Sequence, residues 1–136
     1  MSTSVINAPP CCISIDVEEY FQIEAAQASI PRAQWDQWPS RVEASMDGLL
    51  ELYAQHNIRG TFFVLGSVAQ KHPQLVRRMA DAGHEIASHG TWHQRLHRLN
   101  PQIFREDLHT SKTILEDLSG QPVRGYRAPT FSLVPQ

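Results

Sequence analysis

The apolar positions along this chain form two kinds of pattern, short continuous runs and longer stretches in which they recur at helical spacing. Short runs bounded by turn residues predict buried strands, which we expect over residues 11–17, 61–65, 84–88 and 123–127. The longer stretches predict helices over about residues 41–57, 68–82 and 101–119. Strands and helices therefore alternate, which predicts an α/β fold with a parallel sheet and right-handed crossovers.

Residues typical of helix ends support these boundaries. Ser40 and Glu43 have the spacing of a capping box, which predicts that Ser40 caps the first helix. Asn100 and Pro101 suit the cap and the first turn of the third helix. Between the first strand and the first helix, residues 18–40 are predicted to form a long loop.

Composition and charge exclude several classes of partner. The chain has 136 residues, of which 41% are hydrophobic, and a net charge of -2, which fits one ordinary globular domain. No basic run exceeds two residues, so no nucleic-acid partner is expected, and no apolar stretch is long enough for a transmembrane segment. Residues 1–10 lack a secretion signal and are predicted to be a disordered leader. The expected location is therefore cytoplasmic, with association to the cell envelope left open. The adjacent Cys11 and Cys12 are expected to be buried, unpaired thiols.

Two pairs of metal-ligating residue types follow predicted strands. His89 and His93 come after residues 84–88, and Asp16 and Glu18 lie at the end of the first strand. Because the carboxyl ends of parallel strands meet at one edge of a sheet, these side chains are expected to converge. Two imidazoles and one carboxylate would hold a divalent ion, with zinc as the first choice and cobalt, nickel, manganese or iron as alternatives. The second carboxylate would then act as a general base. Histidines four apart are also common on helices without any metal, so the spacing alone leaves a structural role open.

Four segments in chain order resemble the polysaccharide deacetylase family, which is also called the NodB-homology family or carbohydrate esterase family four. They are SIDVE (14–18), TFFVLG (61–66), GHEIASHGTWH (83–93) and YRAP (126–129), and the resemblance extends over residues 13–131. The opening and the ending also resemble the subgroup found with bacterial exopolysaccharide gene clusters. The resemblance implies a distorted (β/α) barrel of about seven strands. With about four parallel strands and three helices, residues 11–136 are expected to be the N-terminal part of such a domain, a partial barrel.

The resemblance also implies a role for each matching residue. His89 and His93 correspond to the two metal-binding histidines, and Asp16 corresponds to the catalytic base. Arg127 corresponds to the arginine that holds this base, and the backbone N–H of Thr130 corresponds to an oxyanion donor. The implied reaction removes N- or O-acetyl groups from an N-acetylated oligo- or polysaccharide, by attack of a metal-activated water on the carbonyl carbon.

The chain departs from the family pattern in two places. The usual family opening has two adjacent aspartates, the second of which binds the metal, but residue 17 is Val here. The ligand role is expected to pass to Glu18, which shares a strand face with Asp16, rather than to Glu19. The late histidine acid of the family and its carboxylate partner would lie beyond residue 136, so the chain by itself is expected to have impaired activity. Open, apolar strand edges are further expected to promote self-association.

Alternatives stay open for several residues and for the function. Trp92, Tyr20 and Phe21 are expected to bind substrate, because flat rings stack on sugar faces, although packing of the loop explains them equally well. His84 is expected to order its turn and His97 to face solvent. A non-catalytic saccharide- or partner-binding module and a cyclic-amide hydrolase of the same family, such as one acting on allantoin, are the alternative functions. A non-haem iron oxygenase is disfavoured, because such sites usually lie on antiparallel barrels.

Overall fold

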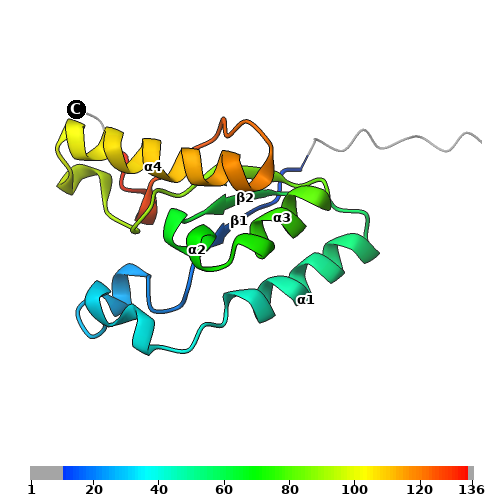
Figure 1. The fold of residues 1–136 in the computed structure, drawn as a ribbon, viewed down its shortest axis with the longest axis horizontal. Helices are drawn as coiled ribbons and strands as arrows, with labels where there is room; N and C mark the ends of the chain where they lie inside the picture. The colour runs from blue at the N-terminus through cyan, green and yellow to red at the C-terminus, as the bar shows by residue number, and fades with distance from the viewer. Residues whose placement is uncertain (1–10, 135–136) are drawn as a thin grey trace, which may run out of the picture.

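A three-stranded parallel sheet lies at the centre of the structure, a computed structural model that describes residues 11–134 (Figure 1). Its strands pair in the order β1 (Ser14–Val17), β2 (Thr61–Val64) and β3 (Glu85–Ser88). The α-helices of the described range are α1 (Val42–Gln55), α2 (Gly66–Lys71), α3 (Pro73–Asp81) and α4 (Pro101–Ser119). Figure 1 shows α4 and α1 at opposite sides of the view, with α2, α3 and the sheet between them. The predicted α/β class with a parallel sheet is confirmed, whereas the predicted leader, residues 1–10, lies outside the described residues.

The two faces of the sheet differ in what they carry. Parallel pairing aligns Ile15, Phe62 and Ile86 across the three strands, and all three contribute to the apolar core. The helices complete this core with buried side chains, namely Val42, Met46, Tyr53, Val68, Ala69, Leu75, Val76, Met79, Ala80 and Leu115. Each large apolar side chain buried in this way contributes about 1.5–3 kcal/mol. The opposite face aligns Asp16 with Phe63, so the sheet itself separates the packed core from the candidate site.

The predicted fourth strand is reduced to one point of contact. Tyr126 forms a parallel bridge with Ser88, and the Ser88 N–H donates to the Gly125 carbonyl over 2.9 Å. The Arg127 N–H donates back to the Ser88 carbonyl, also over 2.9 Å. Gly125 allows this close approach, because an added Cβ would lie 3.1 Å from the Cβ of Ala87. The bridge is short, but it brings Arg127 to the end of β3.

Two predicted boundaries were wrong. The first strand begins at Ser14 rather than at residue 11, and Cys11 and Cys12 before it are exposed free thiols rather than buried ones. The predicted helix over residues 68–82 is two helices, because Pro73 has no N–H with which to continue α2. The residue before it, His72, has the non-helical angles φ -127° and ψ 60°, as the ring of a following proline favours.

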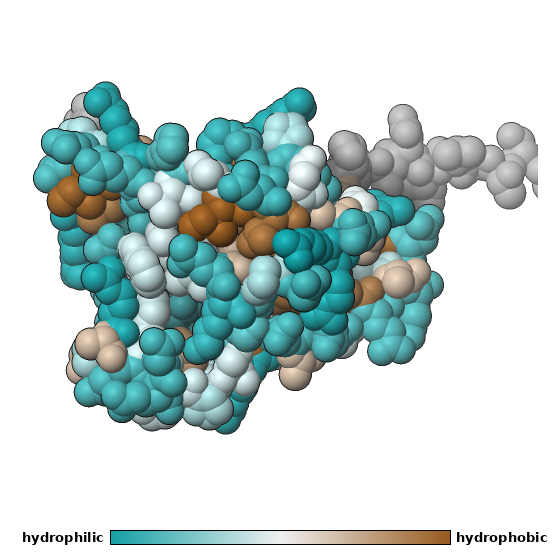
Figure 2. All heavy atoms as spheres, viewed as in Figure 1, coloured by the Kyte–Doolittle hydropathy of each residue, from teal (hydrophilic) through white to brown (hydrophobic). Residues whose placement is uncertain are grey.

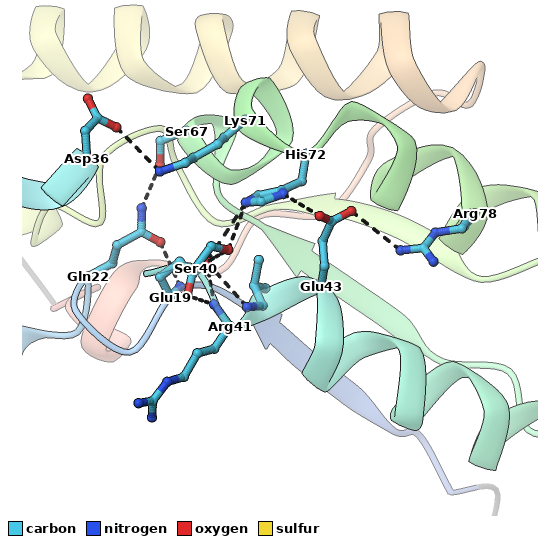
Figure 3. Close-up of polar contacts among 11 residues, drawn as sticks. Glu19, Gln22, Asp36, Ser40, Arg41, Glu43, Ser67, Lys71, His72 and Arg78 are labelled. Atoms are coloured by element: carbon cyan, nitrogen blue, oxygen red, sulfur yellow. Dashed lines mark hydrogen bonds and ion pairs between the residues drawn. The ribbon is translucent and has the colours of Figure 1, made fainter. Parts of the chain in front are cut away.

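A distant carboxylate caps α1 instead of the predicted capping box. Arg41, rather than Ser40, precedes the helix, and its side chain makes no cap hydrogen bond. The buried Glu19 accepts hydrogen bonds from the N–H groups of Arg41 (3.0 Å) and Val42 (3.4 Å), and also from the Ser40 hydroxyl (Figure 3). A negative charge at a helix N-terminus satisfies free N–H groups and interacts favourably with the helix dipole. Glu19 thereby ties the segment after β1 to the start of α1.

The surface seen in Figure 2 is mainly hydrophilic, with separate small groups of hydrophobic side chains. Among residues 11–134, no helix combines the length and the apolar character needed to cross a membrane. Within the described range, β1 pairs only with β2, so β1 forms one edge of the sheet. Self-association through this edge stays a prediction.

Candidate metal centre

The two candidate histidines lie on an irregular loop that begins where β3 ends. His89 follows Ser88 directly, and His93 has a positive φ of 54°. The loop is not a helical turn, so the spacing of four residues does not by itself bring the two imidazoles together. They meet because the loop folds back on itself, with their ring centroids 5.4 Å apart. Both side chains are buried, His89 with 2% and His93 with 3% of its surface exposed.

Hydrogen bonds from three sides fix this loop. The first N–H groups of α2, from Gly66 and Ser67, donate to the carbonyls of Gly90 (2.8 Å) and Thr91 (3.1 Å). Asp107 of α4 accepts from the Thr91 N–H over 3.0 Å, and its own carbonyl accepts from the Thr91 hydroxyl over 2.9 Å. On the third side, the Gln27 side chain donates to the His93 carbonyl over 3.3 Å. Hydrogen bonds within the protein therefore hold the loop in this conformation.

Glu18 joins the two histidines to form a group of three candidate metal ligands. One ligating atom from each of Glu18, His89 and His93 lies within 4.8 Å of the others. Glu18 Oε2 is 2.9 Å from His93 Nε2 and 3.7 Å from His89 Nε2. Two nitrogen or oxygen ligands of a tetrahedral ion lie about 3.3 Å apart, if each is about 2.0–2.1 Å from the metal. The observed separations lie on either side of this value.

The hydrogen bonding of these atoms fits a metal better than a simple polar contact. Glu18 Oε2 is buried and has no hydrogen-bond partner within residues 11–134, although His93 Nε2 is only 2.9 Å away. An ionised oxygen left without a partner in this way costs free energy. A divalent cation between Glu18 and the histidines would satisfy it, and the donor set of two imidazoles and one carboxylate suits zinc and related ions.

His89 is held in a form suited to binding a metal. Its Nδ1 lies 2.8 Å from the Arg127 carbonyl oxygen, so Nδ1 carries the proton and Nε2 keeps its lone pair. Burial lowers the pKa of His89, an effect that Asp16, the Arg127 carbonyl and Glu18 partly oppose. The lowered pKa favours the neutral imidazole, which is the form that can act as a ligand.

Asp16 lies beside this group but has a different partner. Arg127 donates to Asp16 Oδ1 over 2.6 Å and to the Ser14 hydroxyl over 2.6 Å, and its guanidinium lies 4.0 Å from the centre of the Phe63 ring. The other carboxylate oxygen, Oδ2, is 3.9 Å from His89 Nε2. The arginine thus fixes the carboxylate with one oxygen turned toward the three candidate ligands.

Thr130 has the backbone conformation of a residue under local strain. Its φ of 56° is rare for a β-branched residue and costs about 1–3 kcal/mol. Its hydroxyl donates to the Pro129 carbonyl over 2.6 Å. Among the described residues, its backbone N–H donates to no protein acceptor. A strained residue with an available N–H is consistent with the expected oxyanion donor.

The three aromatic residues expected to bind substrate lie in different surroundings. Trp92 is 38% exposed and lines pockets on the side of His93. Tyr20 contributes to a pocket that also contains Asp16 and Glu18, but the Arg41 guanidinium covers its ring at 4.8 Å. Phe21 is only 2% exposed and packs against Tyr20 and Trp35. The stacking role expected for Phe21 is therefore not supported, and its ring mainly holds the loop together.

Sequence reasoning missed the residues that support the site. Glu19 was expected only as the less favoured ligand and His72 only as a surface residue, yet both belong to the network in Figure 3. His72 contacts the Ser40 hydroxyl through Nε2 at 3.1 Å and Glu43 through Nδ1 at 3.1 Å. Asp107, which holds the histidine loop, is likewise not part of any recognisable sequence motif. The proline after His72 was the available signal that this residue leaves the helix face.

Comparison with known proteins gives consistent results. A sequence profile described as polysaccharide deacetylase matches residues 34–133. The peptidoglycan-N-acetylglucosamine deacetylase of Bacillus cereus is 36% identical over 81 residues, which are 60% of this chain and 30% of that protein. The chitooligosaccharide deacetylase of a Bradyrhizobium strain is 34% identical over 82 residues, 60% of this chain and 37% of that protein. The matched region thus spans about a third of the length of these relatives.

The similarity to one solved structure covers a larger share of the chain. A Mycobacterium smegmatis protein assigned to the polysaccharide deacetylases superimposes with a TM-score of 0.71 and 31% identity. The superposition covers 88% of this chain and 42% of that one. The profile match, by contrast, begins after Asp16 and Glu18, so the geometry described above is the main support for these two residues.

Proposed function

This chain belongs to the polysaccharide deacetylase family, and we propose on this basis that it serves the metal-dependent removal of acetyl groups from the N-acetylated sugars of a polysaccharide. The reaction is hydrolysis of a carbon–nitrogen bond other than a peptide bond. The relatives named above are deacetylases of peptidoglycan and of chitooligosaccharides, and an exopolysaccharide is the substrate that the opening and ending motifs favour. We propose the same deacetylase activity for the whole protein.

One observation carries the proposal. Residues from β1, from the loop after β3 and from the segment after the Ser88 bridge converge on one place, where Glu18, His89 and His93 lie beside the Asp16–Arg127 pair. A metal site without a nearby base would equally fit a structural ion. A fixed carboxylate 3.9 Å from a candidate ligand instead fits hydrolysis.

Glu18, His89 and His93 are the residues that would hold the ion, and zinc is our first choice. A bound divalent ion would polarise the acetamide carbonyl and lower the pKa of a water molecule. Both effects would favour attack of the water on an otherwise unreactive amide.

The chain's own residues supply the remaining functions. Asp16 accepts the proton of the attacking water at Oδ2, while Oδ1 stays bound to Arg127. The guanidinium holds Oδ1 and leaves Oδ2 turned toward the metal ligands. The Thr130 N–H donates to the carbonyl oxygen as negative charge develops on it, which is worth about 3–4 kcal/mol for a well-placed donor.

Metal titration and acetate release test this proposal together. We expect the purified chain to bind close to one zinc ion, measured by elemental mass spectrometry and calorimetric titration. The double variant H89A/H93A should lose this ion, whereas His97→Ala should keep it, because His97 is exposed and is not one of the clustered ligands. Equal zinc binding by the native chain and the double variant would refute the metal assignment.

The role of Asp16 needs a separate variant. Asp16→Asn should retain zinc but release acetate from N-acetylated chitooligosaccharides far more slowly than the native chain. Loss of a general base usually lowers the rate by about 10²–10⁴-fold. Retained acetate release by this variant would show that Asp16 is not the base.

A further inference from the structure

We propose that the pocket next to His93 binds a negatively charged sugar unit, so that the polysaccharide is acidic beside the acetylated residue. This inference rests on the proposed function, because it names the substrate class of the same site. The pocket has a volume of about 380 Å³ and is lined by His93, Trp92, Trp35 and three arginines, among other residues. It is therefore adjacent to a candidate metal ligand and large enough for a sugar ring.

The pocket belongs to a longer depression along the surface. A neighbouring pocket of about 340 Å³ shares Arg32, Trp35 and Trp92 with it. Trp92 is 38% exposed and stands where the two meet. Two consecutive pockets that share lining residues suit a chain molecule with several sugar units.

Positive charge in the pocket exceeds negative charge. Arg32, Arg95 and Arg98 line it, whereas Glu24 is the only carboxylate among the described lining residues. Glu24 pairs with both Arg95 (3.0 Å) and Arg98 (3.6 Å), so one carboxylate is shared between two guanidinium groups. Arg32 has no carboxylate within ion-pair distance in the described part of the chain, and its guanidinium lies 4.9 Å from the centre of the Trp92 ring.

The arginines of the pocket suit a carboxylate ligand. A guanidinium group binds a carboxylate particularly well, because it can donate two parallel hydrogen bonds to the two oxygens. The carboxylate of a sugar acid beside Arg32, Arg95 and Arg98 would therefore bind more favourably than a hydroxyl group. A neutral sugar would supply acceptors but would leave the excess positive charge uncompensated.

Binding of two tetrasaccharides to the zinc-loaded full chain tests the proposal. Chitotetraose contains only N-acetylglucosamine, whereas the tetrasaccharide of hyaluronan alternates N-acetylglucosamine with glucuronate. We expect the acidic probe to bind roughly fivefold more tightly in calorimetric titration, which is the effect of one favourable exposed charge pair. The preference should weaken as the ionic strength rises, because salt screens such pairs.

Arginine variants locate the effect. Arg32→Gln and Arg98→Gln should each bring the ratio of the two affinities toward one. Arg77→Gln is the matched control, because Arg77 is an exposed residue of α3 outside the pocket. Free glucuronate should bind far more weakly than the acidic tetrasaccharide, whereas equal binding would mean that the pocket merely collects anions.

The outcomes separate this proposal from the proposed function. Equal affinity for the two tetrasaccharides, or an unchanged ratio in both pocket variants, would overturn the acidic subsite. Preferential binding of the acidic probe without acetate release from any probe would support the subsite and count against deacetylase activity of this chain by itself. Acetate release from chitotetraose, together with equal affinity for the two tetrasaccharides, would support the deacetylase function and count against the acidic subsite.

Discussion

Replacing Gly90 with alanine tests whether the fold determines the histidine loop. Gly90 lies between the two candidate ligands and has a φ of 80°. A Cβ at this position would lie 2.9 Å from Asp107 Oδ2, the oxygen that accepts the Thr91 N–H. Asp107 can retreat only by giving up that hydrogen bond, which is one of those that hold the loop.

The expected loss of stability has two parts. A left-handed backbone costs a residue with a Cβ about 1–2 kcal/mol more than glycine. Loss of a hydrogen bond to a charged group adds about 1.5–3 kcal/mol. Gly120→Ala is the matched control, because Gly120 has a φ of 67° but its added Cβ would meet nothing within 4 Å. Gly120→Ala should therefore lose only the free energy of the left-handed backbone.

Urea denaturation of the two variants and zinc titration measure these parts separately. We expect Gly90→Ala to cost more unfolding free energy than Gly120→Ala, by about the worth of the lost hydrogen bond. We also expect it to weaken zinc binding, which Gly120→Ala should leave unchanged. Equal losses of stability and equal zinc affinity in the two variants would refute the reasoning that Asp107 and Gly90 together hold the loop.

Two further variants test the supporting structure. Glu19→Gln should lower the unfolding free energy by about 1–3 kcal/mol, because it removes the charge that caps α1; Glu51→Gln, on the exposed face of the same helix, should change it little, and a similar loss in both would contradict the capping role. Burial, with a smaller contribution from Arg59, lowers the pKa of His84 below 6.5 in the folded state. Above pH 6.5, His84 is neutral in both states and does not lower the unfolding free energy. As the pH falls below 6.5, His84 is protonated in the unfolded chain before it is protonated in the folded protein, so the unfolding free energy decreases. Denaturation over a pH series should show a flatter dependence in His84→Gln but not in His56→Gln, and identical slopes in the two would refute this assignment.

The class of fold and the proximity of three candidate ligands could be predicted from local patterns in the sequence. Apolar runs followed by turn residues marked the strands, and the alternation with helices implied their parallel order. Because ligands at the ends of parallel strands must meet, Glu18, His89 and His93 could be grouped from their positions in the chain alone. These predictions depend only on residue spacing and on the direction of the chain.

Contacts between distant segments could not be predicted in the same way. The Ser40–Glu43 spacing fits a capping box, yet Glu19 takes its place from more than twenty residues away. Asp107 likewise reaches the histidine loop from α4 without any spacing rule. The prediction of a fourth strand over residues 123–127 was wrong for a related reason. The length of a strand depends on the strand beside it, and in the described part of the chain this segment pairs only through the bridge to Ser88.

The different surroundings of the two acidic residues favour a metal more strongly than the histidine spacing does. Asp16 lies within β1 on the face that it shares with Phe63, where Arg127 balances its charge over 2.6 Å. Glu18 lies just past the strand, and no hydrogen bond within residues 11–134 satisfies its buried Oε2. The neighbouring His89 does not supply a positive charge, because burial lowers its pKa. A carboxylate oxygen that is buried among imidazole nitrogens without a hydrogen-bond partner is costly. A divalent ion is the group that would balance it, and the same ion would explain why the arginine is aimed at Asp16 and not at Glu18.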